Sequence, residues 1–311
     1  MRSVFAVLIA AWLVWLLFNA DFDSAAGFFD LWSWQLGLFA TVWFFLPLAL
    51  LFFWKWSLSF SAGLHLPWSE CLKTQSIAWA GRYLPGKAGF WFAKVSVESS
   101  EASAVRRFSH AVLAEQALFV SAGLLIVVAL LPWNFGSLTT RTLFPISAFH
   151  EYWSFLLGSA GLRVALVALL IVCTISFIAL LARLLNSNVE FFDWKRWLLL
   201  LTGHCSLHTF LGLSLFPLIV LIAPDSAAVY GWTGVVAVLA LANIAGILAF
   251  FAPAGLGVRE FVIAFCFANQ LGIESALQIA AFLRLVTFIS DILFSLTAWM
   301  SGRILERNRS R

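Results

Sequence analysis

The sequence predicts an all-α membrane protein, a polytopic bundle of about eight transmembrane helices, on the strength of three observations. Of the 311 residues, 62% are hydrophobic and 11% are charged, whereas soluble globular domains carry about 25% charged residues. The hydrophobic residues form runs close to the roughly 20 residues that a helix needs to cross a bilayer. The charged residues lie mostly between these runs. No polar segment is long enough for a separate soluble domain, so we treat residues 1–311 as a single integral membrane domain.

The apolar runs predict the crossings in order. Val4–Phe18 lacks a clear small-x-small cleavage site, so we expect an uncleaved first helix rather than a signal peptide. Val258–Leu271 has about 14 residues, which is short for a span, and counting it as a crossing gives eight. The full-length spans are predicted at Leu31–Trp54, Ala111–Leu131, Val164–Ala182, Trp197–Ile222, Val229–Phe251 and Ala276–Met300.

Basic residues favour a cytoplasmic location for both termini. The segment between the second and third predicted crossings is rich in them, whereas the loop that contains Asp21 has none. The basic residues of that segment are Lys55, Lys73, Arg82, Lys87, Lys94, Arg106 and Arg107. By the positive-inside rule this segment is cytoplasmic, and an even number of crossings returns the arginine-rich carboxy terminus to the same side. We therefore expect a multi-pass protein of the cell (inner or cytoplasmic) membrane, and the net charge of +4 does not indicate a nucleic-acid partner.

Two proline- and glycine-rich stretches interrupt the apolar sequence. The residues that are expected to break the helices are Pro85, Gly86 and Gly89 in the first stretch and Pro253, Gly255 and Gly257 in the second. Proline removes a backbone donor and glycine loosens a helix, and in lipid such a break persists only where protein or a water-filled cavity satisfies the freed groups. The apolar flanks of the first break, Cys71–Ala80 and Ala88–Val97, predict a re-entrant helical hairpin. Both breaks are therefore candidate sites.

The segments that come after the two breaks suggest an internal repeat. Within each putative half, 31–182 and 197–302, the order is a break, a short helix, a polar turn and a span. Glu115 and Arg284 occupy corresponding places about 30 residues after the prolines, and their charges are opposite. A charge in lipid is costly unless it is paired or faces water, so we expect these two residues to lie near one another or to line one cavity. The crossing count places both breaks on the cytoplasmic side, whereas an inverted repeat would place them on opposite sides.

The segments around both breaks resemble the lysylphosphatidylglycerol synthase transmembrane-region family of flippase-like integral membrane proteins. The matching residues are Tyr83-Leu84-Pro85-Gly86-Lys87, Val112-Leu113-Ala114-Glu115-Gln116, Pro253-Ala254-Gly255-Leu256-Gly257-Val258-Arg259-Glu260, Gly272 and Leu283-Arg284. The resemblance implies a multi-helix bundle with re-entrant segments that moves lipids between leaflets. Phe90-Trp91-Phe92 stand where family members often carry an acidic residue, and Ala254 stands where a glycine is usual. We find no soluble aminoacyl-transferase segment in this sequence, so lysine transfer to a lipid is not expected.

Charged residues near the two breaks are the candidate lipid-binding residues. They are Arg82, Lys87, Glu115, Arg259, Glu260 and Arg284. Cations at headgroup depth beside free helix-end N–H groups suit a lipid phosphate. The alternatives are that Arg82 and Lys87 only fix the orientation of the helices, and that Arg259 and Glu260 form a local ion pair.

Histidines on one predicted helix are the other candidates for chemistry. His204 and His208 are spaced i, i+4, which suits a metal, but no third ligand is evident. We therefore expect both in a hydrogen-bonded bundle interior, with no metal and no cofactor. Arg284 and Asp291 share a helix face but lie about 10 Å apart, too far to pair directly. Trp54, like other tryptophans near span ends, is expected to be an interfacial anchor.

Taken together, the sequence favours a lipid transporter without enzymatic activity. We expect it to move an anionic phospholipid or isoprenoid phosphate between leaflets, with membrane lipids as its partners. One alternative is a non-transporting accessory subunit of envelope lipid or glycan synthesis, which would have envelope-synthesis proteins as partners. Another is an intramembrane enzyme that uses His204 and His208.

Overall fold

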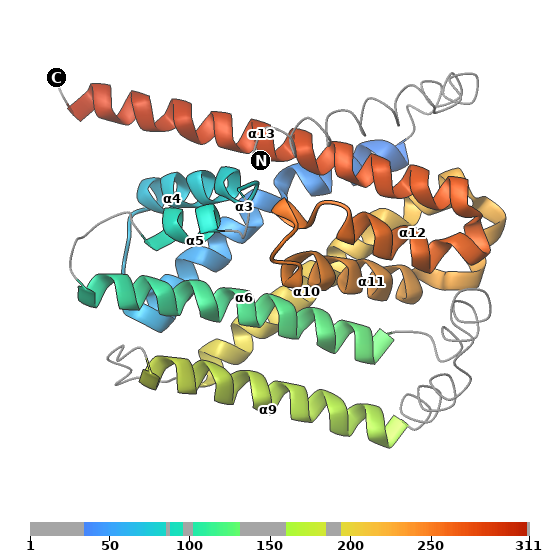
Figure 1. Ribbon diagram of the computed structural model, residues 1–311, viewed down its shortest axis with the longest axis horizontal. Coiled ribbons are helices and arrows are strands. Elements are labelled where there is room, and N and C mark those ends of the chain that lie inside the picture. The colour runs from blue at the N-terminus through green and yellow to red at the C-terminus, as the bar shows by residue number, and fades with distance from the viewer. Residues whose placement is uncertain (1–33, 85–87, 96–101, 131–159, 185–193, 310–311) are drawn as a thin grey trace.

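The fold is a bundle of α-helices, as predicted (Figure 1). The computed structural model describes residues 34–84, 88–95, 102–130, 160–184 and 194–309. The elements in these ranges are α3 (Trp34–Ala62), α4 (Trp68–Gly81), α5 (Ala88–Val95), α6 (Ala102–Leu130), α9 (Ala160–Leu184), α10 (Trp194–Ile222), α11 (Pro224–Leu248), the short 3₁₀ helix η2 (Pro253–Gly255), α12 (Val258–Leu271) and α13 (Ile273–Arg309). No β-strand occurs in the described ranges.

Six of the described helices are long and apolar enough to cross a membrane. They are α3, α6, α9, α10, α11 and α13, and each contains most of one predicted full-length span. The predicted first helix, Val4–Phe18, lies outside the described residues. Helix α12 has the predicted bounds, and its 14 residues fall short of the roughly 20 that a span needs. The chain is therefore a multi-pass helical membrane protein.

The helix ends differ most from the prediction where a polar segment continues a helix. Helix α6 begins at Ala102 rather than at Ala111, so it includes Arg106, which is exposed. Helix α3 likewise continues to Ala62, beyond Trp54. Hydropathy marks only the apolar part of such a helix, whereas the backbone hydrogen bonds continue through the polar turns.

Helices α4 and α5 form the hairpin that the first break predicts (Figure 1). Two glycines allow the end of α4 to approach the start of α5 closely. A Cβ atom on Gly81 would lie 2.5 Å from the carbonyl carbon of Gly89, and a Cβ atom on Gly89 would lie 2.5 Å from the Gly81 oxygen. Any larger side chain at either position would have to displace backbone. The glycines thus contribute to the break by allowing close packing as well as by loosening the helix.

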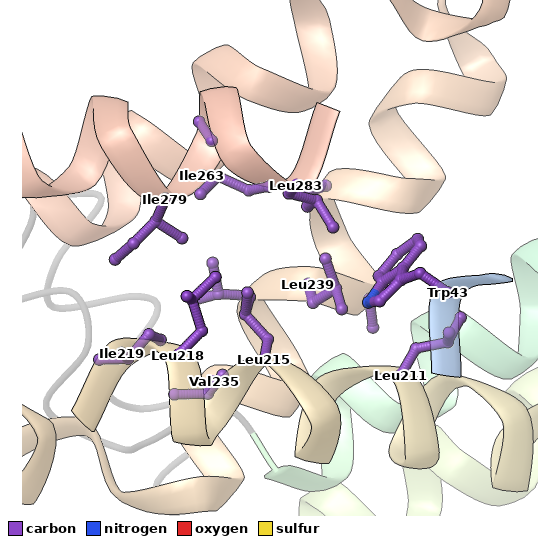
Figure 2. Packing of buried hydrophobic residues seen from close by; sticks show 14 of the residues in the cluster. Trp43, Leu211, Leu215, Leu218, Ile219, Val235, Leu239, Ile263, Ile279 and Leu283 are labelled. Atoms are coloured by element: carbon purple, nitrogen blue, oxygen red, sulfur yellow. The ribbon is translucent and has the colours of Figure 1, made fainter. Parts of the chain in front are cut away.

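The main hydrophobic core lies between α3, α10, α11, α12 and α13 (Figure 2). Leucine and isoleucine side chains from α10 pack against α11, and Ile279 and Leu283 of α13 lie above them with Ile263 of α12. Gly212 of α10 allows a close approach to α11, since a Cβ atom there would lie 2.5 Å from the Cα atom of Val236. Small residues commonly permit such packing between membrane helices. This core holds the second break against the rest of the bundle.

Candidate functional site

The two breaks lie against each other, although they are far apart in the chain. The backbone N–H of Ala254 donates a hydrogen bond of 2.8 Å to the carbonyl oxygen of Arg82. Ala254, Gly255 and Gly257 have positive φ values of 51°, 70° and 80°. Gly255 packs against Gly246 of α11, because a Cβ atom on it would lie 2.9 Å from the Gly246 Cα atom. The left-handed backbone turns the chain back at this point, and glycine suits two of the three positions.

Asp291 of α13 binds the end of α4 through three donors. The indole N–H of Trp79 donates to Asp291 Oδ1 over 2.6 Å, and the hydroxyl of Tyr83 donates to Oδ2. The Arg82 guanidinium forms an ion pair with the same Oδ2 atom and lies 4.2 Å from the centre of the Trp79 ring. Burial lowers the pKa of Arg82, but the charges and hydrogen bonds of Asp291 and Tyr83 together outweigh burial and raise the pKa, so Arg82 remains charged. Asp291 therefore anchors the first break to the last helix.

Glu260 lies between two arginines at the second break. Its Oε1 atom is 3.8 Å from Arg259 Nε and 3.8 Å from an Arg284 nitrogen, while its Oε2 atom accepts the N–H of Gly257. Arg259 donates to the Thr287 hydroxyl over 3.1 Å. Burial lowers the pKa of Arg259 to about 10, Glu260 opposes that shift and Arg284 adds to it. Arg259 thus keeps its positive charge at neutral pH. The predicted local pair of Arg259 and Glu260 is present, and Arg284 joins it.

Lys94 and Glu115 form a buried ion pair that was not predicted from the sequence. Lys94 is fully buried and Glu115 is 3% exposed. The Lys94 ammonium lies 4.0 Å from the centre of the Trp54 ring and 4.7 Å from that of Phe90, distances typical of cation–π contacts. Burial lowers the pKa of Lys94, and the Glu115 carboxylate opposes that shift. Trp54, which we expected to be an interfacial anchor, is fully buried in this contact instead.

A partly open cavity of about 160 Å³ lies where the two breaks meet. Both putative halves contribute to its wall, with Arg82 and Glu115 from the first and Ala254 and Arg259 from the second. Polar groups also reach it from Gln116, His204 and Asn243. The remaining lining side chains are mostly apolar and include Trp43, Leu46, Leu50, Trp79, Phe90, Phe119, Leu211 and Ile247. Such a wall, apolar with a few charged groups, suits a ligand that has both an ionic and a hydrocarbon part.

The two histidines lie in the bundle interior, as predicted. The Nδ1 atom of His204 is 2.8 Å from the Leu200 carbonyl oxygen, and the Nε2 atom of His208 is 3.1 Å from that of Phe119. The part of the chain that the structure describes contains no group of three His, Cys, Asp or Glu residues that could hold a metal ion. His204 also lines the cavity, which the helical spacing alone did not indicate.

The predicted site residues fall into two groups with different partners. Arg82, Arg259, Glu260 and Arg284 lie around the meeting point of the breaks, together with Asp291. Glu115 lines the same cavity but pairs with Lys94, whereas Arg284 pairs with Glu260. We expected Glu115 and Arg284 to lie near one another or to line one cavity, but Arg284 does not line this cavity and the two residues have different partners.

Three of the predicted residues, Pro85, Gly86 and Lys87, lie outside the described ranges.

This chain matches no protein-family model and no curated protein.

Proposed function

We propose that this protein is a flippase-like lipid transporter, of the kind found in the lysylphosphatidylglycerol synthase transmembrane-region family, and that it moves an anionic lipid between leaflets. One observation carries the proposal. The two helix breaks meet at a cavity whose wall combines apolar side chains with the guanidinium groups of Arg82 and Arg259. The headgroup would bind these arginines while the acyl chains stay in the bilayer.

Broken helices at a shared cavity also suit a change of access from one leaflet to the other. In many membrane transporters the site lies where discontinuous helices of two halves meet, and one half moves against the other. Here the end of α4 in the first half is joined to the second half by the Asp291 cluster and by the Ala254–Arg82 hydrogen bond. We propose that these contacts form and break as the two halves move.

The test is transport in liposomes reconstituted with the purified protein. A lipid with a fluorescent acyl chain and an anionic headgroup is incorporated, and the fraction accessible to a membrane-impermeant quencher is followed with time. We expect the parent protein to move the lipid and Arg259→Ala to lose at least about tenfold in rate, the scale of losing one charge-assisted contact. Arg284→Ala should also transport slowly, because Glu260 would then pair with Arg259 alone and neutralise it.

Arg183→Ala is the matched control, because Arg183 is exposed on α9 and lies away from the cavity. If Arg259→Ala and Arg284→Ala both transport like the parent, the site assignment is wrong. If the parent protein itself moves no anionic lipid, the transporter proposal fails and the accessory-subunit alternative takes its place.

A further inference from the structure

The buried charges around the cavity do not sum to zero. Among the described residues, the charged side chains that are buried or line the cavity are Arg82, Lys94, Arg259, Arg284, Glu115, Glu260 and Asp291. Four cations therefore face three carboxylates. A buried ion without a counter-ion is costly in a membrane protein, so one negative charge from outside this set is needed to balance the cluster.

The surplus charge can be assigned to the second break from the pairing. Asp291 neutralises Arg82, and Glu115 neutralises Lys94. Glu260 alone serves both Arg259 and Arg284, at 3.8 Å from each, which is too long for a hydrogen bond. Accordingly, Glu260 Oε1 has no hydrogen-bond donor and Arg259 Nε has no acceptor. Of the two arginines only Arg259 lines the cavity, so the surplus charge is accessible there.

We propose that the cavity binds one singly charged phosphodiester group of a membrane lipid through Arg259, and that it discriminates against groups that carry two or more negative charges. This inference rests on the proposed function in one respect only, namely that the phosphodiester group belongs to a membrane lipid. A phosphodiester carries one negative charge at neutral pH, which equals the surplus. A phosphomonoester carries about −1.5 to −2 and a diphosphate carries more, so either would leave the cluster negative.

The size and wall of the cavity fit a headgroup that is attached to hydrocarbon. A volume of about 160 Å³ is roughly ten times the 10–15 Å³ that a cavity needs by this measure to hold one water molecule, which is enough for a phosphodiester group. The guanidinium can bind two phosphate oxygens at once, which is the geometry that arginine offers and lysine does not. Leu46, Leu50 and Phe119 line the rest of the cavity and would contact the glycerol and the first methylene groups.

The first experiment measures binding without transport. The full-length protein, purified in a neutral detergent, is titrated with dihexanoyl phosphatidylglycerol as the phosphodiester probe. Dihexanoyl phosphatidic acid, farnesyl diphosphate and inorganic phosphate are titrated in parallel. We expect one phosphatidylglycerol per chain, bound at least about tenfold more tightly than the other three, since an unmatched buried charge costs at least that much. Equal or tighter binding of phosphatidic acid or the diphosphate would overturn the charge rule. Equal binding of inorganic phosphate would overturn the lipid origin.

Variants that change the charge at the site test the rule through a gain of binding as well as through a loss of binding. Arg259→Gln should lose most of the phosphatidylglycerol binding, Arg259→Lys should keep part of it, and the exposed control Arg183→Gln should bind like the parent. Glu260→Gln raises the surplus to two charges, and its amide oxygen can still accept the N–H of Gly257. This variant should change its preference from phosphatidylglycerol to phosphatidic acid.

A misfolded variant would not gain affinity for a new ligand. Tighter binding of phosphatidic acid by Glu260→Gln could therefore not be explained by a loss of stability. An unchanged preference in that variant, or unchanged binding by Arg259→Gln, would refute the inference. Binding and transport can also fail separately. A protein that binds phosphatidylglycerol by this rule but moves no lipid would overturn the proposed function and leave the inference standing.

Discussion

At the scale of single residues, the Lys94–Glu115 pair shows how a membrane protein can keep two charges in its interior. The ammonium is enclosed by Trp54 and Phe90, and the carboxylate lies at the cavity wall. In a water-poor interior neither charge is tolerable alone, so each depends on the other. The pair also links the short helix α5 to α6, which fixes one side of the cavity.

Lys94→Met is therefore expected to destabilise the protein strongly. Removing one partner of a buried pair leaves an uncompensated charge and typically costs about 3 to 5 kcal/mol. The double variant Lys94→Met/Glu115→Leu should lose less than the single variant, because no charge remains unpaired. Thermal and chemical unfolding in detergent would measure both, with the exposed Lys73→Met on α4 as control. A single variant as stable as the control would contradict this account of the pair.

The site residues that could be identified from the sequence are those that stand inside or beside apolar runs. Glu115, Arg259 and Arg284 are conspicuous there because a charge in a predicted span calls for an explanation. Lys94 was counted only among the basic residues that orient the helices. The partners of Asp291 come from α4, which lies more than 200 residues away in the chain, and nothing local in the sequence indicates that contact. Which charged residues pair across the bundle depends on how the helices pack, and no local pattern in a single sequence predicts it.

At the scale of elements, glycine pairs hold each break in place. Gly81 meets Gly89 where α4 turns into α5, and Gly246 of α11 meets Gly255 at the second break. In both places backbone touches backbone, so no side chain can be inserted without moving a helix. Where the structure describes them, the two breaks are thus closely packed joints.

Gly81→Ala tests this packing directly. A methyl group 2.5 Å from the Gly89 carbonyl carbon would push α5 away from α4, so we expect a loss of at least about 1 to 3 kcal/mol, as for overpacking in other cores. Gly37→Ala in α3 is the control, because nothing lies within 4 Å of its Cβ position. That substitution should be neutral or stabilise α3 by up to about 1 kcal/mol through helix propensity. The measurement is the unfolding temperature of each variant in the same detergent, which should be lower for Gly81→Ala than for Gly37→Ala. Equal unfolding temperatures would count against a tight contact between Gly81 and Gly89.

The elements themselves could be predicted well from the sequence, and their ends less well. Hydropathy located all six described spans, and α12 has the bounds expected from Gly257 and Gly272. The carboxy-terminal end of α3 and the start of α6 were missed because the polar turns there remain helical. Element order after each break agrees with the proposed repeat, with α5 before α6 and α12 before α13. The two short helices differ in length, at 8 and 14 residues, so any symmetry between the halves is loose.

At the scale of the whole molecule, the apolar surface is what a bilayer requires. Large hydrophobic side chains are exposed on every one of the six described spans. Helix α9 is the most peripheral of them, since only 11% of its most apolar stretch is buried. In water such surfaces would drive aggregation, whereas lipid tails satisfy them without cost.

Orientation in the membrane gives a prediction for the molecule as a whole. We expect both termini in the cytoplasm and the turn between α10 and α11, next to Asp225 at the start of α11, on the outer face, because the basic loops are retained inside. Fusions of a phosphatase that is active only outside the cytoplasm, placed after residue 225 and after residue 311, would test it. The first fusion should be active and the second inactive. The reverse pattern, or two active fusions, would show that the orientation is wrong.

The hydrogen bond between Ala254 and Arg82 has a consequence for how this protein can vary. Both of its atoms belong to the main chain, so neither side chain is needed to make it. Replacing Arg82, or replacing Ala254 by glycine, which suits its φ of 51°, leaves donor and acceptor in place. Sequence drift can therefore alter the charges around the cavity, and with them the ligand, while the halves remain joined at the same point.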